Sequence, residues 1–367
     1  MNASSLRPFL SRRSVSRETS TRSTVLDFAG SDGGRYITYL IASLERSETF
    51  LSNPWSDPQL DLYVALLGLR RVISSVRLLD DLKPAYSQAA LVVIDRNEAV
   101  GASTVVLDRN YYTGKFHFGE EPPGVIRMPF SMHPAVYRAG LHRRLNSFRS
   151  RPQSIGMFFA GTTGAVYADR FKFPLMTRQD IFEALESALQ LIAFSATNPS
   201  ALGRGEYLQQ FVASLTEDGR DVLNKHALTL HSYFDALAVS AFALCPPGIE
   251  YPHSHNLVEA MAVGAVPITN YASYLTPPLK HGENCLQFST ADELREVVSM
   301  ALRMPDAERQ RMRRNVLDYY DTFMNPTSFG QRLFEAARSG TRLLVNDSGN
   351  SVALRAAELT ENVGPAS

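Results

Sequence analysis

The chain has 367 residues, which at roughly 100–200 residues per domain predicts two domains. Hydrophobic residues make up 44% of it and charged residues 20%, as in an ordinary globular protein. Its 37 Lys and Arg residues balance its 37 Asp and Glu residues, so nothing in the overall charge points to nucleic acid or an anionic membrane as the main partner.

The longest apolar run, residues 236–245, is about half the ~20 residues that span a bilayer, so no transmembrane helix is expected. The two cysteines, Cys245 and Cys285, have no metal-like spacing. We interpret them as small core thiols in preference to a disulfide.

The N-terminal residues 1–23 are rich in Ser and Arg and lack the apolar core of a secretory signal. A mitochondrial transit peptide has a similar composition. We favour a disordered basic tail, which could also touch anionic lipid.

The first half of the chain alternates strand and helix patterns. A strand, a glycine-rich loop at residues 30–34 and an amphipathic helix open an α/β unit. The predicted strands are residues 24–29, 91–94, 104–107 and 124–130, and the predicted helices are residues 35–46 and 59–75.

Residues 145–154 show no apolar periodicity, and we predict that they link two domains. A second α/β series follows. Its predicted strands are residues 154–160, 241–245, 265–269 and 285–288, and its predicted helices are residues 177–194, 256–263 and 291–303.

The chain is therefore predicted to be an α/β protein with two Rossmann-like domains facing a cleft. The first domain covers residues 24–148 and the second residues 154–335. Residues 336–367 are expected to form a C-terminal helix or tail that frays.

The most informative stretch, residues 245–268, has the order strand, polar loop, helix, glycine, strand. Its loop follows a strand, where open α/β sheets bind ligands, and it leads into a helix N-terminus, which attracts phosphate. The loop supplies Pro247, Gly248, His253, Ser254, His255 and Asn256, and Glu259 follows one turn into the helix. A plainer alternative is that Asn256 and Glu259 form a capping box.

Residues 259–268, Glu-Ala-Met-Ala-Val-Gly-Ala-Val-Pro-Ile, resemble the donor-site element of GT-B glycosyltransferases. The wider pattern is similar to the exostosin family, through Pro247-Gly248, Ser254, Glu259-Ala260 and Gly264-Ala265-Val266-Pro267-Ile268, with weaker pieces at 126–129, 158–161, 277–279 and 285–288. The resemblance implies a GT-B fold in which Glu259 holds the ribose of a nucleotide-sugar and Ser254 its phosphates.

Two departures from these families bear on mechanism. Exostosins usually carry Arg where this chain has Asn256, so a phosphate-binding cation must come from elsewhere. The candidates are Arg170, Lys172 and Arg178, in and after the loop that follows Gly161, although a surface cation is the plainer interpretation of each. The retaining family 4 enzymes carry a second glutamate where this chain has Tyr251, which favours an inverting mechanism.

An inverting enzyme needs a general base near the acceptor hydroxyl. Asp32, in the first glycine-rich loop, is the first candidate and His133 the second, with Glu120 and Glu121 as further options. Turn and loop roles are the plainer interpretations. No Asp-x-Asp tripeptide occurs, so we expect neither a metal nor another cofactor.

We therefore expect a metal-independent glycosyltransferase that moves a sugar from a nucleotide-sugar to a glycan, lipid-linked or small-molecule acceptor. A non-catalytic scaffold that binds sugar or nucleotide and a sugar-nucleotide epimerase remain alternatives. The resemblance further suggests a cytoplasmic enzyme of polysaccharide biosynthesis. The basic tail leaves peripheral membrane contact open, and the balanced charge predicts no nucleic-acid partner.

Overall fold

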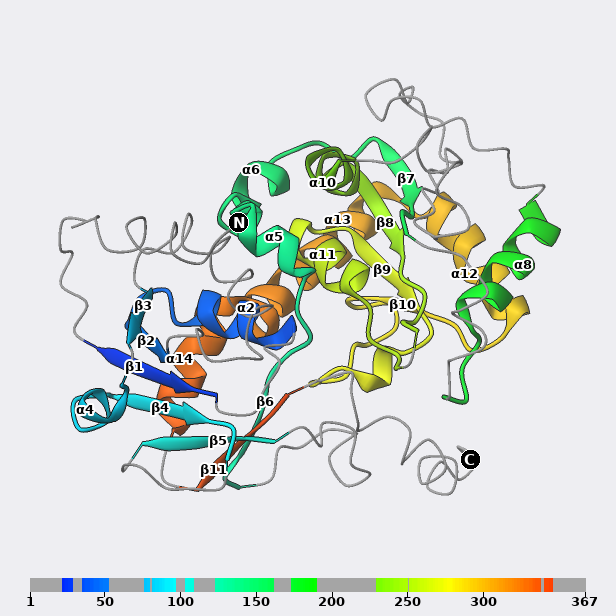
Figure 1. Cartoon of the computed structure of the whole chain (residues 1–367). Coiled ribbons are helices and arrows are strands. Elements are labelled where there is room, and N and C mark those ends of the chain that lie inside the picture. Colours follow the sequence, from blue (N-terminus) through cyan, green and yellow to red (C-terminus); the bar gives the residue numbers. More distant parts are fainter. Residues whose placement is uncertain are drawn as a thin grey trace, which may run out of the picture.

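The computed structural model describes residues 22–28, 35–52, 76–79, 81–96, 103–108, 123–161, 173–189, 229–249, 251–337 and 340–345. These residues form two α/β units, each built around a parallel β-sheet (Figure 1). The predicted fold class, α/β with two Rossmann-like units, is confirmed.

The first unit contains a seven-stranded sheet in the order β3-β2-β1-β4-β5-β11-β6. At its centre, Leu26 lies opposite Leu51 on one side and Val93 on the other. Its strands include buried apolar residues, such as Val25, Leu26 and the run Leu91–Ile94, as expected of a parallel sheet that is covered on both faces. They are β1 (Ser23–Asp27), β2 (Glu48–Ser52), β3 (Val76–Leu79), β4 (Leu91–Ile94), β5 (Thr104–Asp108), β6 (Val125–Arg127) and β11 (Thr341–Leu344).

The second unit contains a four-stranded sheet in the order β10-β9-β8-β7. Its strands are β7 (Ile155–Phe158), β8 (Ser240–Leu244), β9 (Val266–Thr269) and β10 (Leu286–Gln287). In Figure 1, α8 (Arg178–Leu189) and α12 (Ala291–Arg303) lie together beside this sheet. The helices α10 (Leu230–Ala238), α11 (His255–Val263) and α13 (Asp306–Tyr319) lie on its other side.

The C-terminal part of the chain returns to the first unit. A π-helical turn, η6 (Tyr320–Met324), leads from α13 into α14 (Pro326–Ala336). Helix α14 packs on α2 (Arg35–Ser43) so closely that a Cβ at Gly330 would lie 2.0 Å from the Ser43 carbonyl oxygen. Strand β11 then enters the first sheet, which adds a strand that the sequence did not predict.

A segment of short helices runs between the two sheets. It contains α5 (Pro134–Arg138), η3 (Leu141–Arg143) and α6 (Leu145–Arg149). The predicted linker at 145–154 therefore begins with a helix, because Leu145 and Phe148 share one face and both are buried against α10 and α11. Two other short helices are α4 (Lys83–Tyr86) and η5 (Ala272–Tyr274).

Most of the elements predicted from the sequence are confirmed with small shifts at their ends. The sequence did not predict the strands β2, β3 and β11 or the helices α4, α5, α6, α10, α13 and α14. The expected helix at 59–75, the glycine-rich loop at 30–34, nearly all of the basic tail and the expected fraying end lie outside the described residues. The exact domain boundaries stay predictions. No helix in the described part of the chain is both long and apolar enough to cross a bilayer.

Candidate functional site

The loop between β8 and α11 lies at the carboxyl end of a central, fully buried strand. Ser254 ends this loop as the N-cap of α11, with an extended backbone at φ −135° and ψ 143°. The first amides of α11 have no partner within the helix, and the helix dipole places partial positive charge there. This end of α11 is therefore suited to an anion.

Gly248 is required by the shape of this loop. Its backbone N–H donates to the Pro252 carbonyl at 3.1 Å. A Cβ at this position would lie 2.6 Å from the His253 carbonyl oxygen and 2.7 Å from that of Tyr251. The loop can fold back this tightly only because residue 248 has no side chain.

Arg178, from the first turn of α8, reaches this loop from the side. Its Nε and Nη2 donate to the Pro247 carbonyl at 3.3 and 2.9 Å, and Nη2 also donates to Ser254 Oγ at 3.4 Å. The side chain is only 4% exposed, and its guanidinium lies 5.8 Å from the ring centre of Phe159. A Cβ on Gly161 would lie 3.6 Å from Arg178 Nη1. The arrangement fixes a full positive charge beside the α11 N-terminus.

Glu259 lies one turn into α11 and is 5% exposed. Its Oε1 accepts the backbone N–H of His133 and its Oε2 accepts the hydroxyl of Tyr233, both at 2.9 Å. The pKa of the Glu259 carboxyl lies above its ordinary value, because burial disfavours the charged form more than the bonds from His133 and Tyr233 favour it.

The capping-box alternative is not observed, because Ser254 and not Asn256 is the N-cap of α11. The carboxylate of Glu259 instead binds groups from other segments. A contact between Glu259 and a ribose stays a prediction, and it would have to share oxygens that already accept protein donors.

A group of rings packs beside the loop. The Phe130 ring centre lies 5.4 Å from that of His253 and 4.9 Å from that of His255. The Nδ1 of His255 lies 2.7 Å from the carbonyl oxygen of Ser131, to which it donates. These contacts join the loop to the chain segment that leaves β6.

His133 caps α5, with Nδ1 accepting the backbone N–H of Ala135 at 3.2 Å. A neutral imidazole that accepts at Nδ1 carries its proton on Nε2. In this orientation Nε2 of the neutral ring can donate a hydrogen bond, but it cannot accept a proton as a base. Its ring also meets that of His255 edge-on at 5.3 Å.

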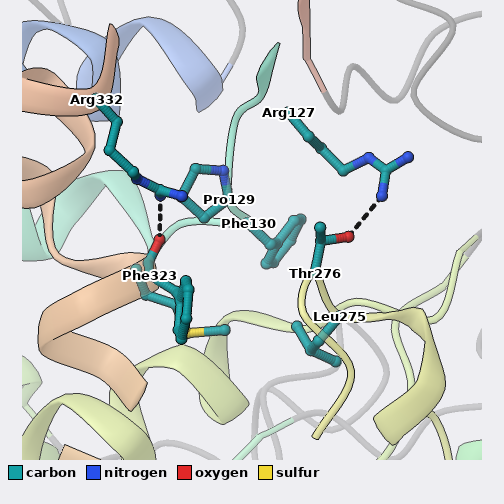
Figure 2. Close-up of a pocket in the computed structure, with 8 residues that line it drawn as sticks. Arg127, Pro129, Phe130, Leu275, Thr276, Phe323 and Arg332 are labelled. Atoms are coloured by element: carbon teal, nitrogen blue, oxygen red, sulfur yellow. Dashed lines mark hydrogen bonds between the residues drawn. The ribbon is translucent and has the colours of Figure 1, made fainter. Parts of the chain in front are cut away.

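A small pocket adjoins this region between the two units (Figure 2). Arg127, 5% exposed, donates to Thr276 Oγ1 at 2.5 Å across it, and Arg332 donates to the Phe323 carbonyl at 2.9 Å. Phe130 lines this pocket and also contacts the rings of His253 and His255, so the pocket and the α11 loop share a wall. The remaining lining residues are Pro129, Leu275 and Met324.

The structure gathers most of the residues predicted for the site. The α11 N-terminus and its loop bring together Arg178, Pro247, Gly248, His253, Ser254, His255, Asn256, Glu259 and His133, with Gly161 beside Arg178. Asp32, Arg170 and Lys172 lie outside the described residues, as do Glu120 and Glu121.

Three residues at the site were missed. Phe130 and Ser131 directly follow Pro129, and the sequence pattern predicted only the end of a strand at this place. Tyr233 carries no local signal, because only the folded arrangement of α10 against α11 brings it to Glu259.

Cys245 and Cys285 are both buried and free, as the sequence predicted, and burial raises the pKa of the Cys285 thiol to about 12. Within the described ranges, no three His, Cys, Asp or Glu side chains gather into a group that could hold a metal ion.

No family model matches the sequence, and no curated protein matches it. Among solved structures, a glycosyltransferase involved in avilamycin A biosynthesis is similar, with 12% identity, 86% of this chain and 96% of that one covered, and a TM-score of 0.40. Sucrose-phosphate synthase from Thermosynechococcus elongatus is also similar, with 12% identity, 86% of this chain and 98% of that one covered, and a TM-score of 0.44. UDP-GlcNAc 2-epimerase from Methanocaldococcus jannaschii has 9% identity, with 85% of this chain and 98% of that one covered and a TM-score of 0.35. With identities and TM-scores this low, the likenesses assign no activity.

Proposed function

We propose that the chain is a glycosyltransferase that moves a sugar from a nucleotide-sugar donor to a hydroxyl group of an acceptor. The observation that carries the proposal is the buried Arg178 guanidinium against Ser254, at the N-terminus of a helix that follows a central parallel strand. The resemblance of residues 259–268 to a donor-site element supports it.

The diphosphate of the donor is proposed to lie at the α11 N-terminus. Amide donors without a partner within the helix, the helix dipole and a guanidinium all favour a multiply charged anion. The guanidinium is held by the Pro247 carbonyl, so it would need little reorganisation on binding. Arg170 and Lys172, which precede α8 in the sequence, are proposed to add positive charge.

In the proposed reaction, an acceptor oxygen forms a bond to the anomeric carbon while the bond to the diphosphate oxygen breaks. The electron pair of that bond leaves with the nucleoside diphosphate, whose developing charge Arg178 and the α11 N-terminus would stabilise. We propose inversion at the anomeric carbon and no requirement for a metal, since the protein supplies the positive charge.

A base must take the proton of the acceptor hydroxyl. Asp32, which follows β1 in the sequence, is our first candidate for this role. His133 is the second, although its Nδ1 bond to Ala135 would have to open, or the ring would have to turn over, before it could accept a proton. The acceptor is proposed to be a glycan, a lipid-linked sugar or a small molecule, met in the cytoplasm or at the membrane surface.

The experiment is a turnover assay with UDP-, GDP-, ADP- and dTDP-linked sugars and CMP-linked sugars, with sugar acceptors, in EDTA and in Mg²⁺. Acceptor-dependent release of one nucleotide, unchanged by EDTA, supports the proposal, and the product anomer reports inversion. Conversion of a sugar-nucleotide into its epimer without acceptor would favour an epimerase. Binding without turnover would favour a non-catalytic scaffold.

A further inference from the structure

The chain passes from the first sheet to the second unit through residues 128–133, which we call the crossing segment. It begins directly after β6 and ends at the N-cap of α5. Figure 1 shows this stretch running from β6 up to α5, beside α11. The position of this segment on α11 therefore contributes to how the two sheets are set relative to each other.

Two polar contacts fix the crossing segment to α11. The imidazole of His255, in the first turn of the helix, donates to the carbonyl of Ser131 at 2.7 Å. The carboxylate of Glu259, one turn later, accepts the amide of His133 at 2.9 Å. Because the two bonds use one carbonyl and one amide of the segment, they fix both its position and its direction.

Phe130 adds an apolar contact to the same junction. Its ring lies between the crossing segment and the loop, against His253 and His255. It also lines the pocket between the units. A shift of the crossing segment would therefore move groups on the loop that precedes the α11 N-terminus.

The carboxylate of Glu259 is committed to protein donors. A buried carboxylate is costly unless donors satisfy it. One oxygen accepts from the crossing segment and the other from the Tyr233 hydroxyl on α10, so the side chain joins three segments. Each carboxylate oxygen therefore already accepts one hydrogen bond from the protein, without any ligand.

We propose that Glu259 is a positioning residue that holds the crossing segment on α11, and that it does not bind the ribose of a nucleotide. Its part in ligand binding rests on the proposed function, because the anchored helix carries the proposed diphosphate site. Its part in holding the crossing segment can be measured without any ligand.

Hydrogen exchange tests the anchoring directly. In Glu259→Ala, the amides of the peptide covering residues 130–135 should exchange about tenfold or more faster than in the wild type, since a bond to a charged group is lost. In Glu259→Gln the side-chain carbonyl can still accept the His133 amide, so exchange should stay within about threefold. Unchanged exchange in Glu259→Ala would overturn the proposal.

A matched control removes another carboxylate that accepts a backbone amide. Glu293 accepts the amide of Ser289 at 2.6 Å at the start of α12. Glu293→Ala should speed exchange near residue 289 and leave residues 130–135 unchanged. If Glu259→Ala does not fold, Tyr233→Phe replaces it, because loss of that hydroxyl frees one carboxylate oxygen and should give a smaller increase at 130–135.

Ligand affinity separates positioning from ribose binding. The probes are UDP and inorganic pyrophosphate, which share a diphosphate but differ in the ribose and the base. If Glu259 positions the site, Glu259→Ala changes both dissociation constants by the same factor, and their ratio stays within about twofold. A contact to the ribose would instead weaken UDP alone by about tenfold, and this result would overturn the proposal.

A wild type that binds neither probe would count against the proposed function. In that case the exchange rates at residues 130–135 still decide whether Glu259 anchors the crossing segment. Failure of the anchoring and failure of the proposed function therefore give different results.

Discussion

Arg178 and Ser254 meet at the N-terminus of α11, where Nη2 of the arginine lies 3.4 Å from Oγ of the serine. They come from different segments of the second unit, and the same guanidinium also binds the Pro247 carbonyl. A helix N-terminus alone is a common feature, whereas one with a buried guanidinium beside its N-cap has two sources of positive charge.

Arg178→Ala should weaken binding of a nucleoside diphosphate by about 1.5–3 kcal/mol, or roughly 10- to 150-fold, because a charge-assisted bond to the diphosphate is lost. Isothermal titration calorimetry measures this change. The matched control is Arg295→Ala, since Arg295 also donates to a backbone carbonyl, that of Ala184, but lies on α12. Equal affinities in wild type and Arg178→Ala would remove Arg178 from the site.

Gly248→Ala should destabilise the protein by about 1–3 kcal/mol, because the new methyl group meets two backbone carbonyl oxygens that cannot move without opening the loop. Chemical denaturation measures the free energy of unfolding. Gly161→Ala serves as a comparison with a smaller expected cost, because its nearest contact is the end of the Phe159 ring, at 3.0 Å. A Gly248→Ala variant as stable as the wild type would show that the loop has another conformation.

The local pattern around β8 and α11 was enough to predict the strand, loop and helix that form this part of the candidate site. The apolar run at 241–245, the Pro-Pro-Gly stop and Gly264 mark the ends of buried elements, and such signals are local in sequence. Gly264 does adopt a left-handed conformation at the end of α11, with φ 86°. Arg178 could be predicted as a cation near a helix start, although its contact with Ser254 could not.

Non-local features could not be predicted from the sequence. Strand β11 is only four residues long, and its burial depends on β5 and β6, which come much earlier in the chain. The bonds from His133 and Tyr233 to Glu259 depend on how three segments pack. A periodicity pattern shows which face of a helix is apolar, but it does not show which polar group lies opposite a buried carboxylate.

The pH dependence of stability should differ between wild type and Glu259→Gln. The pKa of Glu259 is raised by burial, so the folded state binds a proton more readily than the unfolded state. The stabilising effect of this proton is full below the unfolded pKa and is lost as pH rises through the folded pKa. The wild type should therefore lose stability relative to Glu259→Gln with rising pH, by at most about 1.4 kcal/mol per pH unit.

Unfolding curves of the two proteins from pH 4 upward (on the order of one-unit steps) measure this difference. Because both proteins contain all the other carboxylates, subtracting one free energy of unfolding from the other cancels the contributions of those groups. A difference that is constant with pH, or that grows in the opposite direction, would show that the Glu259 pKa is not raised.

Arg149 and Asp321 should be energetically coupled, because they join α6 to the π-helical turn. Both terminal nitrogens of Arg149 donate to the two carboxylate oxygens of Asp321 at 2.8 Å, and its Nε donates to the Ala262 carbonyl at 2.8 Å. Because Asp321 is 45% exposed, solvent screens the pair, and we expect a coupling free energy of only about 0.5–1 kcal/mol.

A double-mutant cycle with Arg149→Ala and Asp321→Ala measures this coupling through the free energy of unfolding. The exposed pair of Lys280 and Glu283, 3.6 Å apart, serves as a control with coupling near zero. Coupling at Arg149 no larger than in the control would mean that the bidentate pair does not hold α6 to the turn.

The α11 N-terminus is proposed to bind the diphosphate of a nucleotide-sugar without a metal. The most direct test is the thermal stability of the wild type with UDP, GDP, ADP, dTDP or CMP, in Mg²⁺ and in EDTA. We expect one nucleotide, at about 100 times its dissociation constant, to stabilise the fold by ~2.7 kcal/mol equally in both conditions. No stabilisation by any of the five, or stabilisation only with Mg²⁺, would contradict the account.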